Sequence, residues 1–109
     1  IPATVTIDGV TYKVTSVAAN AFKGNKKITK VTIGKNIETI GKNAFYGCKK
    51  LSSITFKTTK LKASKVGKNA FKGVKAKVTV KVPKNKAKEY KKWLKKKGIP
   101  ANAKFKTAK

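Results

Sequence analysis

The sequence Asn-Ala-Phe-Tyr-Gly at residues 43–47 recurs as Asn-Ala-Phe-Lys-Gly at residues 20–24 and 69–73. The three phenylalanines are spaced by 23 and 26 residues. An apolar-polar-apolar triplet begins seven residues after each final glycine, at residues 31–33, 54–56 and 80–82, with the same two spacings. A period in the twenties that is kept by apolar and glycine positions predicts a repeat protein whose consecutive coils stack.

Each triplet has the alternation of a short strand with one buried face, so Val31 and Ile33 should be buried and Thr32 exposed. Stacked coils place equivalent strands side by side in a parallel sheet. We therefore predict an α/β solenoid with three repeats over residues 14–83. In the second repeat we expect a helical turn that begins near Asn43, is capped by the side chain of that residue and ends at Gly47.

The segments on either side of the repeats are predicted to be caps. In residues 1–13, alternating stretches flank Asp8-Gly9, a sequence typical of a two-residue hairpin turn. We expect this hairpin to lay one apolar face on the first coil, with Ile7 opposite Val10 and Val5 opposite Tyr12.

Residues 84–109 should form the C-terminal cap, with a helix over about residues 85–97. An alternative for this lysine-rich helix is an amphipathic segment that lies on membranes or anionic polymers. We expect residues 104–109 to be frayed. Residues 57–65, which carry the three extra residues of the third coil, should form a surface loop.

The chain is strongly basic. It contains 29 basic residues, all of them lysine, and three acidic residues, which gives a net charge of +26. Lysine is a hydrated point charge, whereas the guanidinium group of arginine makes bidentate hydrogen bonds to phosphates and to the edges of guanine bases. The lysines are therefore interpreted as a solvated coat, or as a surface for non-specific attraction to anionic polymers. We expect no specific nucleic acid partner, because the repeated phenylalanines should be in the core instead of stacking on bases.

The inventory of side chains argues against an enzyme or a metal site. The chain has no His, and Cys48 is its only cysteine, interpreted as a small buried core residue. Asp8, Glu38 and Glu89 are not placed as an acid–base pair. We predict no enzymatic activity and no cofactor. No apolar run is long enough to span a membrane.

The strand alignment predicts which side chains share the exposed sheet face. Three rows are expected: Thr6, Thr32, Thr55 and Lys81; Thr4, Lys30, Ser53 and Thr79; and Asp8, Gly34 and Lys57. Hydroxyl groups with scattered lysines could bind glycans or anionic polymers, although exposed threonine is also a good strand former. The predicted binding residues, on what should be the concave face, are Thr6, Lys30, Thr32, Ser53, Thr55, Lys57, Thr79 and Lys81.

Residues 37–54 resemble one repeat of the BspA-like leucine-rich repeat family of bacterial cell-surface proteins. They read Ile-Glu-Thr-Ile-Gly-Lys-Asn-Ala-Phe-Tyr-Gly-Cys-Lys-Lys-Leu-Ser-Ser-Ile, and the pattern extends over residues 14–83. Asn25 and Val74 replace its cysteine in the other copies. The resemblance implies secretion, display at the bacterial cell surface and a role in binding or as a spacer, and it implies no active site.

Together these observations predict an extracellular interaction module that binds a protein, a glycan or an anionic cell-wall polymer. Two alternatives remain: a lysine-rich binder of anionic polymers such as nucleic acid, and a passive spacer. We expect a monomer. The opening Ile1-Pro2-Ala3-Thr4-Val5 is typical of an internal segment, so we also expect the chain to be a fragment of a longer protein.

Overall fold

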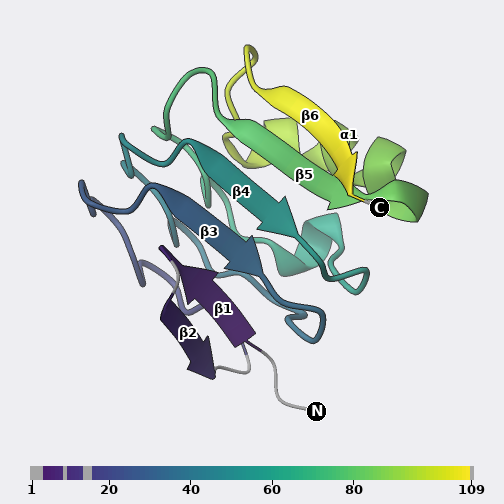
Figure 1. Ribbon diagram of the computed structural model, residues 1–109, viewed down its shortest axis with the longest axis horizontal. Coiled ribbons are helices and arrows are strands. Elements are labelled where there is room, and N and C mark those ends of the chain that lie inside the picture. The colour runs from purple at the N-terminus through teal and green to yellow at the C-terminus, as the bar shows by residue number, and fades with distance from the viewer. Residues whose placement is uncertain (1–3, 9, 14–15, 109) are drawn as a thin grey trace.

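The computed structural model describes residues 4–8, 10–13 and 16–108 (Figure 1). Six strands form one sheet in the order β2-β1-β3-β4-β5-β6, and the connecting segments pass behind it. The strands are β1 Thr4–Ile7, β2 Val10–Lys13, β3 Lys30–Ile33, β4 Ser53–Phe56, β5 Thr79–Pro83 and β6 Lys104–Ala108. The helix α1 spans Ala87–Leu94, and 3₁₀ turns lie at Ala63–Lys65 (η1), Lys84–Lys86 (η2) and Lys95–Lys97 (η3).

The three repeated triplets form β3, β4 and β5, which pair in parallel with equivalent residues opposite each other. Val31 lies beside Ile54, and Ile54 lies beside Val80. All three side chains are buried, whereas Thr32 and Thr55 between the apolar positions are only half-buried. The predicted strands, their alternation and their parallel register are confirmed.

The hairpin has the predicted internal register, with Ile7 opposite Val10 and Val5 opposite Tyr12. Val5 and Ile7 of β1 are buried, but Val10 of β2 is 54% exposed. The expectation that both strands contribute to one buried apolar face is therefore wrong at Val10, because β1 pairs with β3 and β2 is the outer strand. Gly9 of the turn and residues 14–15, which follow the predicted end of the cap at residue 13, lie outside the described residues.

The repeated asparagines do not start capped helical turns. Asn20, Asn43 and Asn69 all have left-handed backbones, with φ of 61°, 58° and 59°. The buried Oδ1 of Asn43 has no hydrogen-bond partner among the described residues, so it caps nothing. Asparagine tolerates the left-handed region better than most residues, which explains its presence in each coil.

Six aromatic rings run through the core from the first coil to the helix. Phe22, Phe45 and Phe71 stack in register, with ring centroids 5.3 and 5.4 Å apart. The edge contacts continue from Phe71 through Phe56 to Tyr90, and Tyr90 packs against Trp93 of α1. The helix is thus part of the same core as the repeats.

The longer third coil is not a simple surface loop. Thr58 and Leu61 are fully or almost fully buried within it. The Tyr90 hydroxyl donates to the carbonyl of Thr58 at 2.9 Å and accepts from the amide of Leu61 at 3.2 Å. The Thr58 hydroxyl donates to the carbonyl of Ile37 at 2.7 Å. The expectation of a surface loop over residues 57–65 is therefore wrong at Thr58 and Leu61, whereas the other seven residues of the segment are exposed.

The C-terminal segment departs from prediction in two ways. Helical conformation extends over residues 84–97, close to the predicted 85–97, but only α1 is regular α-helix. The expected frayed tail is wrong, since β6 pairs with β5 in parallel. Pairing satisfies the backbone groups along the edge of β5, and Phe105 lies beside Val80 and packs against the core.

Candidate functional site

The exposed face of the sheet carries the first predicted row in register. Thr6 pairs with Thr32, Thr32 with Thr55, and Thr55 with Lys81. The row continues onto β6 at Lys106. The four threonine and lysine side chains of the prediction therefore lie next to one another across β1, β3, β4 and β5.

The second row is correct for three of its four members. Lys30, Ser53 and Thr79 are aligned, and Lys104 of β6 extends the row. Thr4 does not belong to it, because β1 runs antiparallel to β3 and its direction reverses the order of its residues.

The same reversal corrects the third row. Asp8 does not lie beside Gly34 and Lys57, because it lies at the other end of the strands, next to the first residue of β3. The Asp8 amide donates to the carbonyl of Lys30 at 3.0 Å. Lys57 lies at the carboxyl end of β4, where its amide donates to the carbonyl of Ile33.

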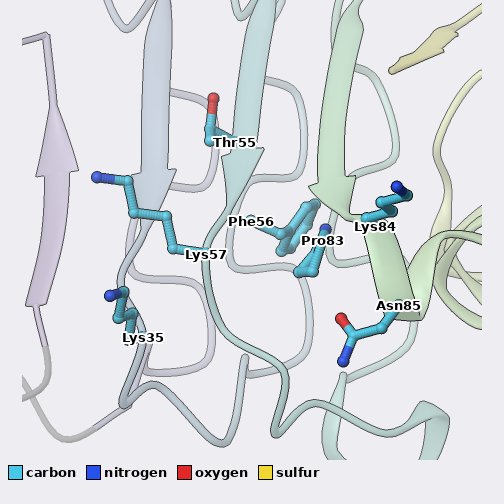
Figure 2. Close-up of a pocket in the computed structure, with 7 residues that line it drawn as sticks. All are labelled: Lys35, Thr55, Phe56, Lys57, Pro83, Lys84 and Asn85. Atoms are coloured by element: carbon cyan, nitrogen blue, oxygen red, sulfur yellow. The ribbon is translucent and has the colours of Figure 1, made fainter. Parts of the chain in front are cut away.

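A hollow of about 730 Å³ opens at the carboxyl ends of β4 and β5 (Figure 2). In Figure 2, Phe56 and Pro83 lie between Lys35 and Lys57 on one side and Lys84 on the other. We call this hollow the strand-end pocket. It is lined by Lys35, Thr55, Phe56, Lys57, Pro83, Lys84 and Asn85.

The charge around the strand-end pocket has one sign. Lys35, Lys57 and Lys84 follow β3, β4 and β5, and all three are exposed. No acidic residue lines the pocket. The one ion pair found among the described residues joins Lys65 to Glu38 at 3.9 Å, away from the pocket lining. The pocket therefore combines positive charge with the partly exposed, uncharged ring of Pro83, whereas the ring of Phe56 is completely buried.

Two of the predicted binding residues, Thr55 and Lys57, line this pocket. Sequence reasoning did not single out the other five, because it compared equivalent positions of the repeats. Lys35 lies two residues after Ile33, whereas the equivalent position in the next repeat is the buried Thr58. The pocket lysines thus do not occupy equivalent positions of the repeats. The one sequence feature that they share is that each follows one of three adjacent strands.

The family model for the BspA type leucine-rich repeat region matches residues 6–96, in six copies. The chain belongs to this family. The match covers most of the sheet and all of α1, and it confirms the family resemblance of residues 37–54. No curated protein and no solved structure matches the chain significantly.

The cysteine of this BspA-type repeat chain is part of the core. Cys48 is completely buried, and its Sγ donates a hydrogen bond to the carbonyl of Phe22 at 3.1 Å. Burial raises the pKa of the Cys48 thiol, which disfavours the nucleophilic thiolate. The environment is that of a structural residue that links two coils.

Asp8 links the hairpin to the repeats in a pH-dependent manner. Its carboxylate accepts hydrogen bonds from the Thr29 hydroxyl at 2.7 Å and from the amides of Thr29 and Lys30. The bond from the Thr29 hydroxyl is the main reason why the pKa of Asp8 is lowered, and the two amides and the Lys30 charge act in the same direction. The charged form is therefore the one that the fold favours.

We expect acid to remove the stabilising contribution of Asp8. Because the folded pKa lies below the unfolded one, the contribution is present above the unfolded value of 3.8 and disappears as the pH falls through the folded pKa. Urea unfolding of wild type and Asp8→Asn between pH 7 and pH 2 should show a stability difference that shrinks below about pH 4. Thr29→Val, which lacks the main hydrogen bond, should show a smaller pH dependence. A difference that stays constant over this range would contradict the role of Asp8.

Proposed function

We propose that the chain is a non-enzymatic interaction module of a bacterial surface protein, with the exposed sheet face as its binding surface. The observation that carries this proposal is the row Thr6, Thr32, Thr55 and Lys81, which presents hydroxyls and an ammonium group in register across four strands. The partner would be an extracellular protein, a glycan or an anionic cell-wall polymer.

The surrounding chemistry supports binding through hydrogen bonds and charge. The hydroxyls of Thr32 and Thr55 make no hydrogen bond within the described part of the chain and are free to bind a ligand. Lys81 and Lys30 are exposed on the same face. Family membership supports the surface location, since BspA-type repeats are associated with bacterial surface proteins. The net charge of +26 favours an anionic partner.

Catalysis has little support in the side chains. The chain contains no His, and Cys48 is buried with its thiol hydrogen-bonded. Among the described residues, no three His, Cys, Asp or Glu side chains cluster so as to hold a metal ion. No helix in that part of the chain is long and apolar enough to cross a membrane.

The proposal predicts a partner whose binding survives high salt and depends on the sheet face. We would test teichoic acid, glycosaminoglycan, mucin glycans, matrix proteins and DNA at low salt and at about 0.5 M salt, where charges are screened beyond roughly 4 Å. The combined variant Thr32→Val and Lys81→Gln should lower the affinity for that partner by about tenfold, or roughly 1.4 kcal/mol.

The matched control is the combined variant Thr39→Val and Lys68→Gln. It makes the same chemical changes at exposed positions outside the sheet, and it should change binding by less than about twofold. If all anionic ligands bind at low salt and are lost together, the lysines act as a generic coat and the proposal fails. Tight, salt-sensitive binding to DNA alone would instead support the lysine-rich nucleic acid binder.

A further inference from the structure

We propose that the strand-end pocket binds a single carboxylated sugar residue of an anionic glycan. The proposal rests on the proposed function, because the pocket opens at one edge of the same sheet and shares Thr55 with it. It names the class of ligand and adds Lys35, Lys84 and Asn85 to the binding surface.

The first argument is charge complementarity. The fold brings Lys35, Lys57 and Lys84 from three separate coils to one hollow. All three acidic residues of the chain lie elsewhere: Asp8 bonds Thr29 and Lys30, Glu38 pairs with Lys65, and Glu89 lies on α1. No acidic side chain of the described residues therefore offsets the three ammonium groups at the pocket. A carboxylate bound between them would supply it.

The second argument is the uncharged part of the lining. Pro83, which is partly exposed, offers an apolar surface between the lysines, and Asn85 and Thr55 approach from opposite ends of the pocket (Figure 2). A sugar ring has an apolar C–H face and a rim of hydroxyls, so it can pack on Pro83 while its hydroxyls bond the amide and the threonine. A bare inorganic anion could accept hydrogen bonds from the same polar groups but would leave the apolar surface of Pro83 uncovered.

The third argument is size. A volume of about 730 Å³ lies in the range of roughly 300–1,000 Å³ that is usual for small-molecule pockets. It suits one or two sugar rings. A longer glycan would place only one or two of its units there.

The arrangement of the strands disfavours an acidic peptide as the ligand. An extended peptide gains much of its affinity by adding a strand to a free sheet edge. β4 is paired on both sides by β3 and β5, and β5 is paired on both sides by β4 and β6. The strands that end at the pocket therefore offer no free edge, and a compact ligand is favoured.

The test uses a galacturonic acid trisaccharide, its methyl ester and a glutamate hexapeptide, titrated calorimetrically into the full chain at about 0.15 M salt. The pocket variant combines Lys35→Gln, Lys57→Gln and Lys84→Gln. The matched control combines Lys49→Gln, Lys50→Gln and Lys75→Gln, which removes the same charge from exposed residues outside the pocket. Thermal unfolding of each variant checks the fold.

We expect the pocket variant to weaken binding of the trisaccharide by about tenfold or more, and the control variant by less than about threefold. Asn85→Ala should weaken it several-fold without a change in net charge. The methyl ester, which keeps the hydroxyls but loses the charge, should bind much more weakly than the acid.

Four results would overturn the proposal: equal losses in the two lysine variants, equal affinity for acid and ester, no binding of the trisaccharide, or stronger binding of the glutamate peptide. The last result would assign the pocket to an acidic protein segment. A partner that is lost in the Thr32 and Lys81 variant but kept in the pocket variant would leave the proposed function intact and remove only the pocket from it.

Discussion

Replacing Gly67 with alanine should lower the free energy of unfolding by at least about 3 kcal/mol, because the coils have no room for a side chain there. A Cβ at this position would press against the backbone N and Cα of Lys42 and lie 2.7 Å from the carbonyl carbon of Gly41. The obstacle is backbone, which cannot rotate away as a flexible side chain could. The two coils would have to move apart.

That separation would break a ladder on the far side of the coils from the sheet. Val17 bridges to Ile40, and Ile40 bridges to Val66, all in parallel. The Gly67 amide donates to the carbonyl of Ile40 at 2.7 Å, directly beside these bridges. Substitution would therefore disturb the register of the coils as well as their packing.

The measurement is urea unfolding of wild type and Gly67→Ala, with Gly24→Ala as the matched control. A Cβ on Gly24 meets nothing within 4 Å, but its φ of +73° is left-handed, so the control should cost only about 1–2 kcal/mol. If the two variants lose equal stability, the close approach of the coils at Gly67 does not carry the expected cost, and this prediction is wrong. Weaker binding of a sheet-face ligand to Gly67→Ala than to Gly24→Ala would show that the spacing of the coils also determines how the side chains align on the exposed sheet face.

The second large effect is expected at Phe45, at the centre of the aromatic stack. Phe45→Ala should cost about 3–5 kcal/mol, because the ring is completely buried and contacts Phe22 on one face and Phe71 on the other. The nearly parallel rings also lose their stacking energy, about 0.5–1.5 kcal/mol for each pair. Few neighbouring side chains can fill the cavity, since the coils are tied together by backbone hydrogen bonds such as that from the Phe45 amide to Ala70.

Phe22→Ala is the matched control in the same repeat position. Phe22 is only half-buried and stacks on one ring instead of two, so its loss should cost roughly half as much. Urea unfolding of the two variants under the same conditions compares them directly. If both variants lose the same free energy of unfolding, the contribution of a ring does not depend on its position in the stack. The first repeat would then be as tightly packed as the central one.

Local patterns in the sequence predicted the repeats well. The buried alternation of Val31 and Ile33 and the parallel register of β3, β4 and β5 both depend on residues that recur in each repeat. The BspA-type family was recognisable from residues 37–54 for the same reason. In each case one coil contains the signal, and its neighbours repeat it.

The asparagines show where a local pattern has two explanations. Asparagine both caps helices and tolerates a left-handed backbone, and spacing alone does not distinguish the two roles. The φ of 58° at Asn43 and its unpartnered Oδ1 identify the second role.

The sequence by itself determined the repeat period, the buried faces and the in-register sheet rows of β3, β4 and β5. Only the tertiary structure decided the direction of β1, the conversion of residues 104–108 into β6, and the gathering of Lys35, Lys57 and Lys84 around Pro83. The physical reason is the range of the interactions. Period and alternation are encoded within each coil, whereas a strand at an edge forms because its neighbour has backbone groups to satisfy. The pocket exists only once three strands end side by side.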